Sequence, residues 1–144
     1  MRVQRVRVID ADRDAVWKVV SDPDRYPSFM PSLARWETLT DRAKGVGARF
    51  MVHWKIGSVP LGGVVEVIEF DEPRDLAWTS VTGITLRGRF RLRDAGDGRT
   101  RVTFRLSYQA PGGILGLIAD RVATRQVSRT LASTLKSLAS QLES

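Results

Sequence analysis

Few residues of this sequence could take part in acid–base, metal or nucleophilic chemistry, and they lie far apart along the chain. The 144 residues hold one histidine, His53, and no cysteine. The lack of cysteine excludes disulfides, iron–sulfur clusters, thiolate zinc sites and cysteine nucleophiles. One histidine cannot form a histidine cluster, so the sequence predicts no metal site and no cofactor. Because His53 alternates with apolar neighbours, we expect it on the solvent side of a strand.

Two carboxylates and two glycine pairs are the remaining features that could do chemistry. Glu66 and Glu69 are three residues apart, which places them on opposite faces of a regular strand unless a bulge intervenes, so they do not form an acid–base pair. The glycine pairs at 62–63 and 112–113 lack the flanking residues of a phosphate-binding loop. Tyr108 or an inward-facing arginine could donate a proton, but such a mechanism has no sequence signature. The sequence therefore favours binding without catalysis.

Strands must position these residues, because alternating apolar and polar residues run from about residue 33 to 109. Turns rich in glycine, aspartate and proline separate six segments of this kind. The predicted strands cover residues 34–40, 48–56, 63–70, 75–81, 84–93 and 99–109. Short connections between successive strands predict an antiparallel meander.

Helical segments flank these strands. A first strand around residues 5–8 precedes a helix capped by Asp10 or Asp12, and Pro23 begins a second short helix. Residues 114–143 form one long helix, possessing an apolar face that packs on the sheet. The fold class is α+β, with a seven-stranded antiparallel sheet and two short helices after the first strand.

The alternation gives the sheet one apolar, aromatic face and one polar face. The inward-facing residues are Trp36, Phe50, Val52, Trp54, Trp78, Leu86, Phe90, Phe104, Leu106 and Tyr108. This set is either a plain close-packed core or the wall of a ligand cavity. Gly88 lies on the same face, and its mixture with large rings favours the cavity. The polar groups of such a cavity would be Tyr108, Thr38, and Ser80 or Thr79.

This order of elements, with DADRDAVW at 10–17 and DPDRYP at 22–27, resembles the START-like (SRPBCC) superfamily with the helix-grip fold. The resemblance is to its bacterial polyketide cyclase/dehydrase and lipid-transport-like branch, and it covers essentially the whole chain as one domain, residues 1–144. It implies that the sheet wraps around the long C-terminal helix and leaves a cavity for an apolar small molecule or lipid. It implies no catalytic residues, because the superfamily has no universal catalytic set.

The net charge of +7 points to a second kind of partner. If the first strand pairs with the last, as in helix-grip proteins, one outer face collects eight arginines. These are Arg5, Arg7, Arg87, Arg89, Arg91, Arg93, Arg101 and Arg105. The face is either an ordinary solvated surface with interspersed carboxylates or a surface that attracts RNA, ribosomes or lipid headgroups. The resemblance extends to small growth-inhibiting relatives, so the alternative function is a toxin acting on a ribosome/RNA or protein partner and paired with an antitoxin.

Two further expectations concern the long helix and the location of the protein. Leu115, Ile118 and Val122 point away from the main apolar face of the helix, which predicts either a gate over the cavity mouth or a separate turn. No stretch approaches the ~20 apolar residues of a membrane span, and the charged N-terminus does not resemble a signal peptide. We therefore expect a cytoplasmic protein with no transmembrane segment.

Overall fold

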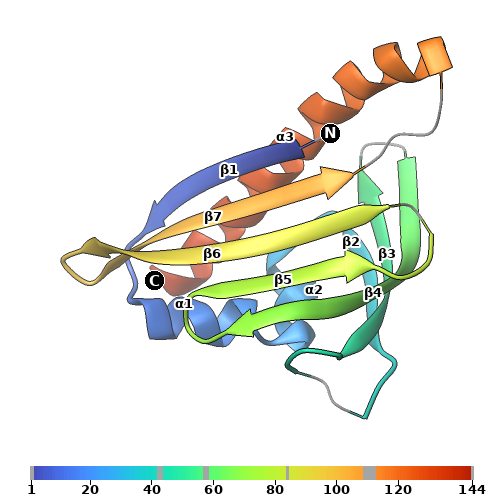
Figure 1. Ribbon diagram of the computed structural model, residues 1–144. Helices are drawn as coiled ribbons and strands as arrows, with labels where there is room; N and C mark the ends of the chain where they lie inside the picture. The colour runs from blue at the N-terminus through green and yellow to red at the C-terminus, as the bar shows by residue number, and fades with distance from the viewer. Residues whose placement is uncertain (1, 42–43, 57–58, 84, 109–112, 144) are drawn as a thin grey trace.

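The computed structural model contains a seven-stranded antiparallel sheet that curls around a long C-terminal helix (Figure 1). It describes residues 2–41, 44–56, 59–83, 85–108 and 113–143, and only the backbone of residues 56, 59–61 and 113–123. The strands are β1 (Arg2–Ile9), β2 (Leu33–Thr38), β3 (Arg49–Ile56), β4 (Val59–Asp71), β5 (Asp75–Ser80), β6 (Leu86–Gly96) and β7 (Arg99–Tyr108). The helices are α1 (Arg13–Val20), η1 (Pro23–Arg25), α2 (Tyr26–Phe29) and α3 (Gly113–Leu142).

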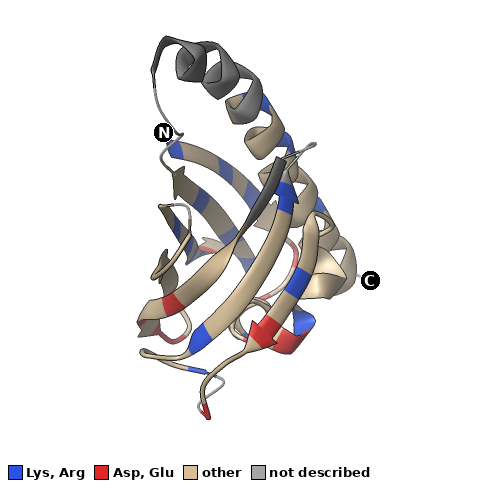
Figure 2. Cartoon of the chain, turned by 90° about the vertical axis from the view of Figure 1, so that its right-hand side faces the viewer, with Lys and Arg blue, Asp and Glu red and all other residues tan. Residues whose placement is uncertain are grey.

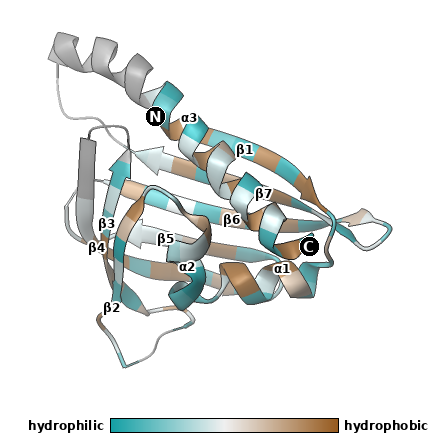
Figure 3. Cartoon of the chain, turned by 180° about the vertical axis from the view of Figure 1, so that it is seen from behind, coloured by the Kyte–Doolittle hydropathy of each residue, from teal (hydrophilic) through white to brown (hydrophobic). Residues whose placement is uncertain are grey.

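The strand order is β1-β7-β6-β5-β4-β3-β2, so the first strand lies beside the last and the others form a meander. The helices α1, α2 and α3 all lie on the same, inner side of the curved sheet (Figure 3). The apolar residues of each strand point to this side, because alternation over a period of two separates the two faces. The predicted helix-grip architecture is confirmed.

The two short helices begin at capped positions. Asp12, rather than Asp10, caps α1, because its Oδ1 accepts a hydrogen bond of 2.8 Å from the backbone N–H of Ala15. Asp22 caps η1 in the same way, with Pro23 at its first position. Together these caps turn the chain so that α2 enters the space under the sheet.

The described part of α3 packs on the sheet through one apolar face. Val127, Leu131, Leu135 and Leu138 are buried, and Leu142 packs partly against the same core. The predicted gate residues are Leu115, Ile118 and Val122, and their side chains lie outside the described residues.

A β-bulge in β4 changes the placement of the two glutamates. The pairing of β4 with β5 shifts between Val67 and Glu69, so Glu66 and Glu69 both lie on the outer face of the sheet. Each carboxylate accepts from a different guanidinium: Glu66 from Arg49 at 2.8 Å and Glu69 from Arg89 at 2.7 Å. The bulge thus overturns the expected opposite faces, and both glutamates serve as partners for arginine.

The predicted placement of Arg5 and Arg7 on the outer face is wrong. In the register of β1 with β7, Arg5 lies opposite Phe104 and Arg7 opposite Val102, both of which are buried on the inner face. Arg5 Nη1 accordingly donates to Ser128 Oγ of α3 at 3.4 Å. Alternation separates two faces but does not say which one is inner, and at this edge strand the exposed face carries valines.

Candidate ligand-binding site

Much of the predicted cavity wall is instead close-packed core, because its side chains contact one another. The rings of Phe90 and Phe104 stack at 4.2 Å, and the Trp78 ring lies 6.0 Å from that of Phe90. From below, α2 inserts Tyr26, whose ring meets Trp36 edge-on at 4.7 Å. This half of the interior is a packed core, in which Phe50 and Leu106 are also buried.

Two features of this packing could not be read from the alternation. The room left by Gly88 is occupied by the Trp78 ring, since a Cβ at Gly88 would collide with that indole. Tyr26 and Phe29 of α2 also fill this half of the interior, which the alternation along the strands did not indicate. Their spacing of three residues put them on one helix face, which was the available signal.

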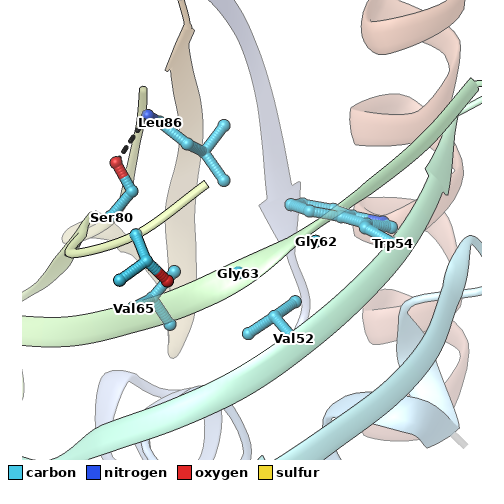
Figure 4. Close-up of a pocket in the computed structure, with 8 residues that line it drawn as sticks. Val52, Trp54, Gly62, Gly63, Val65, Ser80 and Leu86 are labelled. Carbon is cyan, nitrogen blue, oxygen red and sulfur yellow. Dashed lines mark hydrogen bonds between the residues drawn. The ribbon is translucent and has the colours of Figure 1, made fainter. Parts of the chain in front are cut away.

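A small hollow remains between β3, β4 and β6 (Figure 4). Its volume of about 20 Å³ has room for roughly one water molecule. The lining residues are Val52, Trp54, Gly62, Gly63, Val65, Ser80, Thr82 and Leu86. Of the predicted wall residues, Val52, Trp54 and Leu86 line this hollow, and Tyr108 lies beside it, opposite Leu86 in the register.

Two backbones meet closely beside the hollow. Gly63 has φ 146° and Gly83 has φ 85°, and a Cβ on either one would collide with the backbone of the facing segment. The contact joins β4 to the turn that follows β5. The glycine pair at 62–63 thus serves a close backbone contact, which its sequence context did not indicate.

The polar groups around the hollow are few. Ser80 Oγ accepts from the Leu86 backbone N–H at 3.0 Å, and Thr82 Oγ1 accepts from the Val64 N–H at 3.1 Å. Trp54 is 3% exposed, and its Nε1 has no hydrogen-bond partner among the described residues. The Tyr108 hydroxyl lies 3.3 Å from Thr124 Oγ1 of α3. A buried indole N–H without a hydrogen-bond partner is uncommon in a folded protein.

Two of the four predicted polar groups of the cavity are elsewhere. Thr38 is exposed at the end of β2. Thr79 pairs with Glu66 and Arg87 on the outer face, so its neighbour Ser80 is the inward residue. The bulge in β4 does not affect β5, where strict alternation decides between the two.

The described interior offers no acid–base pair. Burial, with Asp22 nearby, raises the pKa of Tyr26 far above its usual range, and its hydroxyl donates to the Val20 carbonyl at 2.6 Å. His53 is exposed, as predicted. No group of three or more potential metal ligands occurs within the described residues. The described lining of the hollow is therefore mostly apolar, with few polar groups.

Arginines and carboxylates both occur on the strands of the sheet (Figure 2), and the register places those of β4 to β7 on its outer face. Asp75 interacts with Arg89, Arg91 and Arg93 at 3.8, 3.3 and 3.2 Å. Arg87, Arg101 and Arg105 make no ion pair within the described part of the chain. Interspersed carboxylates thus neutralise one part of this face and leave another part basic.

The family described as "Polyketide cyclase / dehydrase and lipid transport" matches residues 1–143. None of the curated protein sequences matches the chain. In the part of the chain that the structure describes, no helix is long and apolar enough to cross a membrane.

Solved structures show the same fold at low sequence identity. TTHA0849 from Thermus thermophilus is 19% identical with a TM-score of 0.86, covering 99% of this chain and 97% of that one. A START superfamily protein from Mycobacterium smegmatis is 16% identical with a TM-score of 0.78, at 99% and 97% coverage. The Zhui aromatase/cyclase from a Streptomyces species is 18% identical with a TM-score of 0.79, at 99% and 93% coverage.

These comparisons support a role in binding a hydrophobic ligand. They give no support to a toxin, an antitoxin partner or a ribosome contact. The match over residues 1–143 agrees with the strand order and the long helix found above. The chain therefore belongs to the polyketide cyclase/dehydrase and lipid transport family.

Proposed function

We propose that the protein binds an apolar molecule of the polyketide or lipid class in the hollow that residues of β3, β4, β5 and β6 line. The observation that carries this proposal is Trp54, which lines the apolar hollow and whose buried Nε1 has no partner among the described residues. An unsatisfied buried N–H costs about 1–3 kcal/mol, which a ligand oxygen can recover. The ligand is therefore apolar but bears a carbonyl or hydroxyl oxygen.

The hollow must widen to admit such a ligand. Its volume of about 20 Å³ is far below the ~300 Å³ of a typical small-molecule site. The walls around it are single side chains such as Val52, Val65 and Leu86, in contrast to the stacked rings of the packed half. Ligand binding therefore separates the walls at this end and leaves the aromatic core in place.

The first test enlarges the hollow and measures the binding of a neutral apolar dye. Val65→Ala removes two methyl groups from the wall, so N-phenyl-1-naphthylamine should bind at least threefold more tightly than to the wild-type protein. Fluorescence titration gives the dissociation constants. The matched control is Val102→Ala, at a fully buried position in the packed half.

Both substitutions cost about 1–2 kcal/mol of stability, so general loosening affects the two proteins alike. Equal dye affinity of the two variants would contradict the proposed location. A wild-type protein that binds no dye and carries no apolar adduct in native mass spectrometry would contradict the proposed function itself.

The second test concerns the indole donor. Trp54→Phe removes Nε1 and keeps an aromatic ring, so a dye with a ketone oxygen, such as 6-propionyl-2-dimethylaminonaphthalene, should bind about fivefold more weakly. N-phenyl-1-naphthylamine lacks a carbonyl and serves as the control, with unchanged affinity expected. If both dyes lose affinity equally, the indole acts through its shape and not through its hydrogen bond.

A further inference from the structure

The outer face of the sheet contains a second hollow, on the opposite side from the ligand site. Its volume is about 140 Å³, well above the ~10–15 Å³ that one water needs. Arg2, Arg87, Arg89 and Arg105 surround it. Small residues, among them Ala77 and Ser107, lie between these arginines and leave the space open.

The strand register brings the four arginines together. Arg2 of β1 and Arg87 of β6 both lie opposite Ser107 of β7, one on each side. In the adjacent row of the outer face, Arg89 and Arg105 are directly opposite each other. A cross-strand pair of like charges destabilises a sheet. The guanidinium groups therefore repel one another, and an anion bound between them would reduce this repulsion.

Among the described residues, carboxylates neutralise one of these four charges. Arg89 forms ion pairs with Glu69 at 2.7 Å and Asp75 at 3.8 Å. Arg105 Nε donates to the uncharged Gln4 Oε1 at 3.2 Å. Within the described residues, Arg2 and Arg87 have no ion-pair partner.

The pKa of Arg105 reflects the same concentration of positive charge. Its pKa is lowered from the usual value by desolvation and by the positive charges of Arg2, Arg91 and Arg89. A pKa that falls because of neighbouring cations indicates a local excess of positive charge. An anion in the hollow would reverse that effect.

We propose that this outer hollow binds a phosphate group, as inorganic phosphate or as a phosphomonoester. Guanidinium groups bind phosphate oxygens through paired hydrogen bonds, and several guanidiniums around one open space suit a doubly charged tetrahedral anion. Base stacking plays no part, because no exposed aromatic side chain lines the hollow. The site is separate from the proposed ligand site, so either can fail without the other.

The test follows the arginine Nε–Hε resonances by NMR while inorganic phosphate is added at pH 8 and constant ionic strength. We expect saturable shifts at Arg87 and Arg105. In Arg87→Gln/Arg105→Gln the affinity should fall at least tenfold. The control is Arg74→Gln/Arg99→Gln, which removes the same charge from an exposed turn residue and from the exposed first residue of β7, and which should bind within twofold of wild type.

Three results would overturn the proposal. They are shifts that never saturate, equal losses in the two double variants, and tighter binding of a short RNA that both double variants weaken alike. If Arg87→Gln/Arg105→Gln fails to fold, Arg87→Lys/Arg105→Lys replaces it. This variant keeps the charges and loses the paired hydrogen bonds, so a several-fold weaker affinity is expected, and an unchanged affinity would overturn the proposal.

A vesicle experiment distinguishes a soluble phosphate from a lipid headgroup. Phosphatidic acid carries a phosphomonoester, whereas phosphatidylglycerol carries a phosphodiester. Cosedimentation with phosphatidic acid vesicles, lost in Arg87→Gln/Arg105→Gln, identifies a lipid as the source. Saturable binding of inorganic phosphate without cosedimentation identifies a soluble ligand. Equal cosedimentation with both lipids at matched surface charge would show a purely electrostatic surface and overturn the site.

Discussion

Asp75 is the carboxylate that allows a row of arginines to exist on β6. It is 6% exposed and interacts with three guanidinium groups, from Arg89, Arg91 and Arg93. Alternation places every second residue of β6 on the outer face, so the charges cannot avoid one another. A carboxylate on the neighbouring strand is the simplest way to offset their repulsion.

We therefore expect Asp75→Asn to lower the free energy of unfolding by about 2 kcal/mol at low salt, because three partly exposed guanidinium groups lose the carboxylate that they share. Urea denaturation at 20 mM and 500 mM NaCl measures the loss, which should shrink at high salt as screening weakens the repulsion. The control is Asp97→Asn, whose side chain is 93% exposed and should change stability by less than about 0.5 kcal/mol. Similar losses in both variants would refute this role of Asp75.

At the scale of elements, the contact between β4 and the turn after β5 closes one end of the ligand site. Gly63 and Gly83 approach so closely that neither accepts a side chain, and both have a positive φ. Thr82 is the residue before Gly83, and its Oγ1 accepts a hydrogen bond from the Val64 N–H. The shape of the hollow thus depends on two glycines as much as on its apolar walls.

Gly63→Ala should destabilise the protein by more than about 2 kcal/mol, because the new Cβ would meet backbone atoms and not a movable side chain. Gly98→Ala is the matched control: its φ is 72°, but nothing lies within 4 Å of the added Cβ. There only the backbone strain of about 1–2 kcal/mol remains. Thermal unfolding compares the two, and equal losses would show that the close approach has no energetic consequence.

At the scale of the whole molecule, sequence patterns were enough to predict the fold but not to locate the hollow. Alternation and turn residues predict the strand number and the meander, and aspartate caps predict the starts of the short helices. The pairing of β1 with β7 was an expectation from the resemblance to helix-grip proteins. The packing of the interior could not be predicted in the same way, because it depends on which side chains meet in space. The Trp78 ring occupies the space beside Gly88, and the Tyr26 ring contacts Trp36. These residues lie on the predicted inner face, but they form core and do not line a cavity.

The bulge in β4 and the register of β1 limited prediction of the outer face. A single extra residue moved Glu69 to the side of Glu66, and an edge strand with alternating Arg and Val can dock with either face inward. Both effects are decided by tertiary contacts. Arg87, Arg89 and Arg105 were placed correctly, because β6 and β7 have one strongly apolar face each.

The pairing of β1 with β7 also has a consequence for how the protein is made. The first strand finds its hydrogen-bonding partner only after about a hundred residues have followed it, as in the pairing of Arg2 with Ser107. Contacts between such distant parts of a chain form slowly. During synthesis β1 leaves the ribosome long before β7 exists, so its exposed edge has to remain unpaired while the rest of the chain emerges. The arginines that alternate along it discourage association with other chains during that interval.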